Sequence, residues 1–139
     1  MIKNHSIDLI MSKKLITLHP KDKLQRAKDI FQEYDIHHIP VVVMNKIVGI
    51  LSQGDILYLE NVANNSFDKF IIDKKFELNT IDAVMTKDPI CADINSRIMD
   101  VLDIILYRRI NAVPIVDNDE LVGLVTSIDL LSLMKDHVE

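Results

Sequence analysis

Residues 36–55 read IHHIPVVVMNKIVGILSQGD, and residues 110–129 read INAVPIVDNDELVGLVTSID. In each stretch a β-branched apolar run, a short polar turn and a second apolar run precede a Ser or Thr that stands three positions before an Asp. Two apolar runs around a short turn predict a β-hairpin whose strands are buried. The Ser/Thr-x-x-Asp pattern indicates the start of a helix. The chain is therefore predicted to contain the same unit, a hairpin followed by a helix, twice.

The similarity extends beyond these stretches, because residues 6–57 align with residues 80–131 at a shift of 74 positions without a gap. Fourteen of the 52 aligned positions are identical, whereas chance gives about four. Many of the other pairs exchange one apolar residue for another, which preserves a buried pattern. We therefore divide the chain into a first repeat at residues 6–62, a linker at residues 63–79 and a second repeat at residues 80–135.

Each repeat is predicted to contain helix, strand, helix, strand, strand and helix in that order. Ser6 and Thr80 are the expected N-caps of short opening helices, and Asp22 and Ser96 those of longer amphipathic helices. The remaining elements follow from the apolar spacing: extended pieces at 15–17 and 90–91, and closing helices from 52 to about 62 and from 126 to about 135. The linker fits neither a regular helix nor a regular strand, and we expect its apolar residues to anchor it: Phe67, Phe70, Ile71, Ile72 and Phe76.

Composition limits the classes of protein that the chain can belong to. It has 139 residues, of which 48% are hydrophobic, and a net charge of −5, which indicates a globular protein and disfavours nucleic-acid binding. No apolar run is long enough for a membrane span, and Cys91, the single cysteine, cannot form an internal disulfide, so the cytoplasm is the expected compartment. The histidines show no metal-ligand spacing, and no catalytic motif occurs; we expect neither a metal nor an enzymatic activity.

The hairpin pattern of both repeats resembles the cystathionine-β-synthase-type (CBS) domain, and the resemblance covers about three-quarters of the chain. It implies an α/β (α+β) fold in which two tandem β-α-β-β-α repeats pack through their sheets into one pseudo-twofold module. It also implies association of such modules, here as a homodimer. The implied ligand contains adenosine, such as AMP, ADP, ATP or S-adenosylmethionine, and lies in the cleft between the repeats. No cofactor is expected to be required.

An adenosine ligand needs an apolar slot for the base, a carboxylate for the ribose diol and donors for an anionic group. By family analogy Asp55 and Asp129 contact the ribose. Ser52 and Thr126 offer a hydroxyl and free backbone amides at helix starts. Gly49 and Gly123 are expected to permit close backbone approach. The analogy also assigns main-chain contacts with the base to Val113 and Pro114 for the Asp55 site, and to Ile39 and Pro40 for the Asp129 site, and we include Thr17 among the binding residues.

The two candidate sites differ in charge. His37 and His38 stand where nucleotide-binding members of the family often place basic residues, whereas Asn111 and Ala112 occupy these positions in the second repeat. Residues 10–57 carry seven Lys and Arg against five Asp and Glu, while residues 84–131 carry four against eight. A phosphate is therefore expected at the Asp55 site, with an affinity that rises between about pH 8 and pH 6 as histidine gains a proton. The alternative for the two histidines is an exposed helix-to-strand connection.

Two functions remain open from the sequence. The first is a non-enzymatic regulatory module that binds an adenosine-type ligand and acts on an unidentified regulated protein. The second is a ligand-free dimerisation or interaction scaffold. The Ser/Thr-x-x-Asp motif does not decide between them, because helix capping alone explains it locally.

Overall fold

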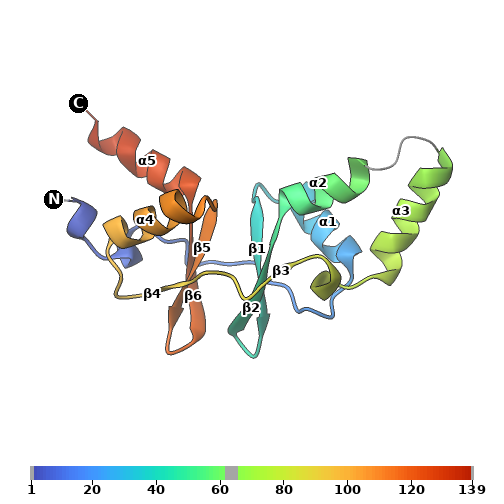
Figure 1. Cartoon of the computed structure of the whole chain (residues 1–139), viewed down its shortest axis with the longest axis horizontal. Coiled ribbons are helices and arrows are strands. Elements are labelled where there is room, and N and C mark those ends of the chain that lie inside the picture. The colour runs from blue at the N-terminus through green and yellow to red at the C-terminus, as the bar shows by residue number, and fades with distance from the viewer. Residues whose placement is uncertain (1, 62–65, 139) are drawn as a thin grey trace. The chain divides into compact units, whose positions relative to one another are not determined.

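The computed structural model describes residues 2–61 and 66–138, and these residues form two compact units (Figure 1). The first unit contains residues 16–61 and 66–88, and the second contains residues 2–15 and 89–138. Each unit is built around the hairpin of one repeat. The opening segment of each repeat, however, packs in the unit of the other repeat. The two units defined by packing therefore have different residue ranges from the two repeats defined by the sequence.

The first unit combines an antiparallel hairpin with three α-helices (Figure 1). In chain order its elements are α1 (Leu24–Glu33), β1 (His38–Val43), β2 (Lys46–Ser52), α2 (Gln53–Asn61), α3 (Ser66–Leu78), the 3-10 helix η3 (Ile81–Ala83) and β3 (Thr86–Lys87). Its core consists of residues from the hairpin, from all three helices and from η3: Leu18, Leu24, Ala27, Phe31, Ile39, Val41, Leu51, Ile56, Ile72, Phe76 and Ile81.

The second unit repeats this plan with two α-helices. In chain order its elements are the 3-10 helices η1 (Ile2–Asn4) and η2 (Ile7–Leu9), then β4 (Ala92–Asp93), α4 (Ile98–Arg108), β5 (Ala112–Asp117), β6 (Glu120–Thr126) and α5 (Ser127–His137). Its core is separate and contains Ile7, Met11, Ala92, Ile98, Val101, Ile105, Val113, Ile115 and Val125.

The two hairpins confirm the predicted repeat in detail. Strand β1 pairs with β2, and β5 with β6, and each pairing shifts register at the same place, between Val41 and Val42 and between Ile115 and Val116. Both hairpins close through two residues with positive φ, as in the tight turns that match strand twist. These residues are Met44 (51°), Asn45 (63°), Asn118 (49°) and Asp119 (67°).

The exchanged opening segments pack against the glycines of the hairpins. A Cβ atom on Gly49 would lie 2.4 Å from Sδ of Met85, and one on Gly123 would lie 2.5 Å from Sδ of Met11. Beside these contacts, β3 pairs with β2 in the first unit, and Ser12 pairs with Leu124 in the second. The two glycines therefore make room for methionine side chains.

Several predicted elements begin or end elsewhere than expected. The opening helices are single 3-10 turns, and α1 and α4 start one residue later than expected, with Lys23 and Arg97 as N-caps. The extended pieces at 15–17 and 90–91 form no strand. Pairing occurs just after them instead, where Leu18 meets Val41 and where β4 pairs with β5.

The linker is more regular than predicted, since α3 occupies most of it. Ile72 and Phe76 lie one helical turn apart and are 8% and 1% exposed, while Phe70 and Ile71 remain on the surface. The anchoring expected of Ile72 and Phe76 is therefore confirmed, and that of Phe70 and Ile71 is wrong, because they lie on another side of the helix. Residues 62–65, and the side chain of the predicted anchor Phe67, lie outside the described part of the chain.

Candidate functional site

The predicted motif of the first repeat joins the end of β2 to the first turn of α2. Oδ2 of Asp55 accepts a hydrogen bond from the backbone N–H of Ser52 at 2.9 Å, and Oγ of Ser52 accepts one from the backbone N–H of Asp55 at 3.1 Å. These reciprocal bonds form a capping box, which satisfies two backbone amides at the helix start. The capping interpretation of the motif is therefore confirmed.

The second repeat contains the same arrangement at the junction of β6 and α5. Oδ2 of Asp129 accepts a hydrogen bond from the backbone N–H of Thr126 at 2.8 Å, and Oγ1 of Thr126 accepts one from the backbone N–H of Asp129 at 3.3 Å. Asp55 and Asp129 thus have the same hydrogen-bond geometry in two separate units. Each lies at a helix N-terminus, where the macrodipole stabilises a negative charge.

Capping uses only one oxygen of each carboxylate. No described residue donates a hydrogen bond to Oδ1 of Asp55 or of Asp129. Because an ionised carboxylate accepts through both of its oxygens, Oδ1 is available to a hydroxyl donor while Oδ2 continues to cap the helix. Capping and contact with a ribose hydroxyl are therefore compatible roles for the same side chain.

His38 distinguishes the site of the first unit. It is the first residue of β1, stands opposite Ser52 in the hairpin and is half-buried, and its buried Nδ1 has no hydrogen-bond partner among the described residues. Burial lowers the pKa of His38 below its ordinary value of 6.5, and His37 lowers it further, while the Asp55 carboxylate acts in the opposite direction. The surroundings of His38 thus disfavour its protonated form at a position where the sequence suggested a cation.

The other candidate residues of the first unit lie along the same end of β1. His37 is exposed, and its carbonyl oxygen accepts a hydrogen bond from the backbone N–H of Gln53 at 2.8 Å. Thr17 is half-buried and directly precedes Leu18, whose N–H donates to the carbonyl of Pro40 at 3.0 Å. Ile39 and Pro40 are buried as whole residues, and the Pro40 carbonyl already accepts the hydrogen bond from Leu18.

The second unit offers a less polar set of groups. Ala112 replaces His38 opposite Thr126, and Cys91 stands 74 positions after Thr17. The Cys91 thiol donates to the carbonyl of Pro89 at 3.3 Å, and burial raises its pKa, which makes it a poor nucleophile. The side chains of Val113 and Pro114 are buried. The two candidate sites therefore differ in His37 and His38 against Asn111 and Ala112.

Two apolar cavities lie away from all the predicted binding residues. One, of about 200 Å³, lies beneath α3 in the first unit, and the other, of about 450 Å³, runs between α4 and α5 in the second. Sequence reasoning missed the second cavity. A comparison of aligned positions could have found it, because polar residues of α1 and α2 in the first repeat align with apolar residues of α4 and α5 in the second.

No group of three or more His, Cys, Asp or Glu side chains in residues 2–61 and 66–138 is arranged to hold a metal ion. Over the same residues, no helix combines the length and the apolar character needed to cross a membrane.

Two capped hairpin-helix units in one chain define a tandem-repeat domain pair, and comparison with known families agrees. The CBS domain model matches residues 6–61 and again residues 81–136. The chain therefore belongs to the CBS domain family.

One known relative is a much longer protein than this chain. Inosine-5'-monophosphate dehydrogenase from Methanocaldococcus jannaschii is 29% identical over 130 residues, which cover 92% of this chain but 23% of the enzyme. The chain thus spans about a quarter of the length of this relative, and only CBS domains are matched.

Two solved structures show the fold of the chain. The CBS domain of a membrane protein from Sphaerobacter thermophilus has a TM-score of 0.80 at 25% identity, covering 95% of this chain and 89% of the other. The CBS domain pair of protein MJ0100, solved with 5'-methylthioadenosine and S-adenosyl-L-methionine, has a TM-score of 0.78 at 29% identity, covering 96% and 98%. The mixed α/β fold of CBS domain pairs is therefore confirmed.

Proposed function

We propose that this chain is a regulatory module that binds an adenosine-containing ligand at the helix starts carrying Asp55 and Asp129, and that it has no catalytic activity of its own. The observation that carries the proposal is the pair of equivalent capping boxes, in each of which one carboxylate oxygen accepts no hydrogen bond from the described residues. Family membership supports the same ligand class, since the CBS domain pair of protein MJ0100 was solved with two adenosine derivatives.

The two sites are proposed to prefer different ligands. His38 beside Asp55 can take up a proton when an anion binds, which suits the phosphate of AMP, ADP or ATP. Ala112 offers no such group at the Asp129 site. We assign an uncharged or cationic tail, as in S-adenosylmethionine, to the second unit. We also propose that the chain associates with itself as a homodimer and that it acts on a separate regulated protein.

A thermal-unfolding panel tests the ligand class. The full chain is heated alone and with AMP, ADP, ATP or S-adenosylmethionine, each at several concentrations. A ligand at 100 times its dissociation constant is expected to add about 2.7 kcal/mol to the free energy of unfolding. Guanosine monophosphate serves as the matched purine control. An unchanged melting temperature with all four adenosine ligands would favour the ligand-free scaffold, in which the capping boxes have only their structural role.

The pH dependence of AMP affinity tests the role of His38. Because its pKa in the unliganded protein is lowered and a bound phosphate raises it, binding takes up a proton. Affinity should therefore rise as the pH falls through the pKa that His38 has in the complex, and level off once the pH is below its lowered pKa in the unliganded protein. Calorimetric titration between about pH 5.5 and 8 measures the profile, with His38→Gln as the control for titration of AMP itself, whose phosphate also protonates near pH 6. If the wild-type chain and the His38→Gln variant give superimposable profiles of AMP affinity against pH, His38 does not interact with the phosphate.

A further inference from the structure

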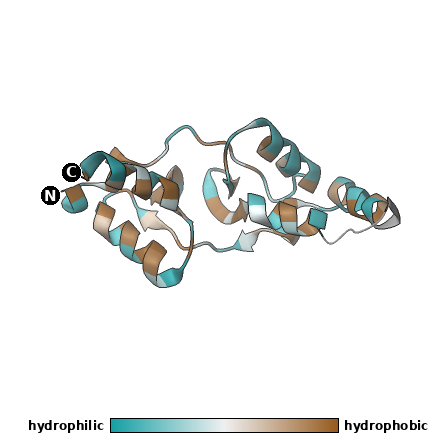
Figure 2. Ribbon diagram, turned by 90° about the horizontal axis from the view of Figure 1, so that it is seen from above, coloured by the Kyte–Doolittle hydropathy of each residue, from teal (hydrophilic) through white to brown (hydrophobic). Residues whose placement is uncertain are grey.

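The helix α3 contacts the rest of the first unit through a small part of its surface. Figure 2 shows hydrophobic and hydrophilic residues mixed along α3, the helix at the right-hand end of the view. Among its described side chains, Ile72 and Phe76 are buried in the core that α1 and α2 share, whereas Phe70 and Ile71 are 60% and 40% exposed. Two buried side chains one turn apart hold the helix in place without filling all the space beneath it.

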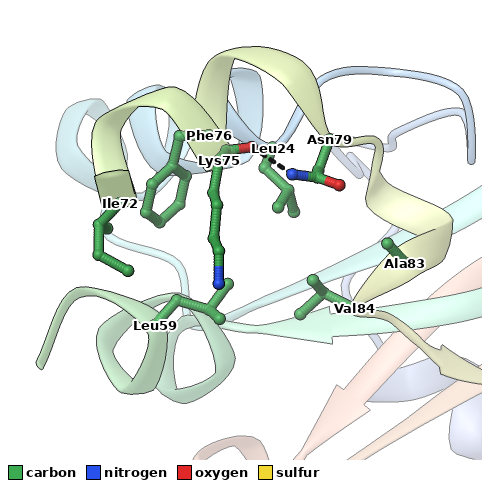
Figure 3. A pocket seen from close by; sticks show the side chains of 8 residues that line it. All are labelled: Leu24, Leu59, Ile72, Lys75, Phe76, Asn79, Ala83 and Val84. Carbon is green, nitrogen blue, oxygen red and sulfur yellow. Dashed lines mark hydrogen bonds between the residues drawn. The ribbon is translucent and has the colours of Figure 1, made fainter. Parts of the chain in front are cut away.

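The space that remains beneath α3 is the smaller of the two cavities. It measures about 200 Å³, and its walls come from α1, α2, α3 and the segment around η3 (Figure 3). Six of the eight lining residues are apolar: Leu24, Leu59, Ile72, Phe76, Ala83 and Val84. The other two, Lys75 and Asn79, are exposed at the end of α3, so the cavity reaches solvent on that side.

The volume and the lining of this cavity limit what can occupy it. Apolar walls offer water too few hydrogen-bond partners, and an apolar cavity of about 150 Å³ stays dry and binds benzene. Atoms that line an unfilled space also lose dispersion contacts, which an apolar guest restores. A nucleotide is too large, because pockets for ligands of that size measure about 300 Å³ or more. The cavity therefore suits an apolar group a little larger than benzene.

The polar end of the cavity carries a positive charge. Figure 3 shows the Lys75 side chain extending from α3 toward Leu59 of α2. No acidic residue lines the cavity, and the Lys75 ammonium group forms no ion pair with the described residues, whereas the neighbouring Lys74 pairs with Glu77 at 3.2 Å. Nδ2 of Asn79 already donates a hydrogen bond to the carbonyl oxygen of Lys75 at 3.1 Å. Lys75 is therefore the donor that an anionic group at this end would meet.

We propose that this cavity binds a small monocarboxylate, with an apolar tail of about six to eight carbon atoms beneath α3 and the carboxylate paired with Lys75. Lys28 adds a second positive charge nearby, since its Nζ lies 5.1 Å from the centre of the Phe76 ring. Ion pairs at the surface are weak, so the tail supplies most of the affinity and the charge sets the preference for an anion. The lining contains neither Asp55 nor Asp129, and the inference does not depend on ligand binding there.

Octanoate is the probe, and octan-1-ol is its neutral counterpart of the same length. Each is titrated into the full chain, and methyl resonances in NMR spectra report binding. Octanoate is expected to give saturable shifts of the Leu59, Ile72 and Val84 methyl groups and Overhauser contacts between these methyl groups and its tail. The amides of α3 should also exchange more slowly at saturating octanoate, because a ligand that binds the folded protein stabilises it.

Substitution of Lys75 tests the contact with the carboxylate. Lys75→Met should weaken octanoate binding by about three- to tenfold and leave octan-1-ol binding unchanged within about twofold. Lys74→Met is the matched control, since Lys74 is the next residue toward the start of α3, pairs with Glu77 and does not line the cavity. It should leave the affinity for both probes unchanged.

Circular dichroism melting shows whether each variant is folded, and the Overhauser contacts are measured on the wild-type chain, so they do not depend on the variants. Support requires contacts between the octanoate tail and the cavity methyl groups, together with the selective loss in folded Lys75→Met. The proposal is overturned if octanoate shows no saturable binding, or if its tail contacts only residues outside the cavity lining. Equal weakening by Lys74→Met and Lys75→Met would also overturn it, because the positive charge of α3 as a whole would then explain the preference for an anion.

Discussion

An Asp55→Asn, Asp129→Asn double variant is expected to show no adenosine-ligand binding at concentrations that saturate the wild-type chain. Asparagine keeps a side-chain oxygen that can accept from the backbone N–H of Ser52 or Thr126, as Oδ2 does now. It loses the negative charge that favours both ribose hydroxyls as donors. Isothermal titration with the ligand that gave the largest thermal shift measures the effect.

A matched control separates ligand contact from capping. The Ser52→Ala, Thr126→Ala double variant removes the hydroxyl half of each capping box and leaves both carboxylates in place. It should lose about 1 kcal/mol of stability per helix. Because the two hydroxyls are themselves candidate ligand contacts, it should also weaken binding, but less than the asparagine variant does. The two carboxylates have no part in binding if the asparagine variant has wild-type affinity.

Phe76→Ala should lower the free energy of unfolding by about 3–5 kcal/mol, which makes it the most destabilising substitution considered in this protein. The ring is 1% exposed, belongs to the core of the first unit and lies beneath the Lys28 ammonium group. Removing it leaves a cavity and detaches α3 from α1 and α2, so the amides of α3 should also exchange faster. Urea denaturation and hydrogen exchange measure the two effects.

Phe70→Ala is the control within the same helix. Phe70 also has a lysine over its ring, with Lys74 Nζ 5.8 Å from the centroid, but it is 60% exposed. Its loss should change the free energy of unfolding by no more than about 0.5 kcal/mol. Equal destabilisation by the two substitutions would mean that Phe76 does not hold α3 against α1 and α2.

Much of the fold could be predicted because its signals are local. The alternation and turn residues around Asn45 and Asn118 specify hairpins, and Ser52 and Thr126 specify the helix starts that follow them. The motif also located the carboxylates at those helix starts. The protonation of His38 could not be predicted in the same way, because it depends on how deeply the ring is buried and on which charges surround it.

The sequence by itself determined that the chain is a duplication, that each copy forms a capped hairpin-helix unit, and that Asp55 and Asp129 are equivalent. Only the tertiary structure decided that each opening segment packs with the hairpin of the other copy, and that α3 packs against α1 and α2. The reason is physical: an apolar pattern specifies which residues leave water, but not which surface they meet. Because the two repeats share one pattern, Met11 and Met85 are compatible with either glycine, and only the path of the chain in three dimensions selects between them.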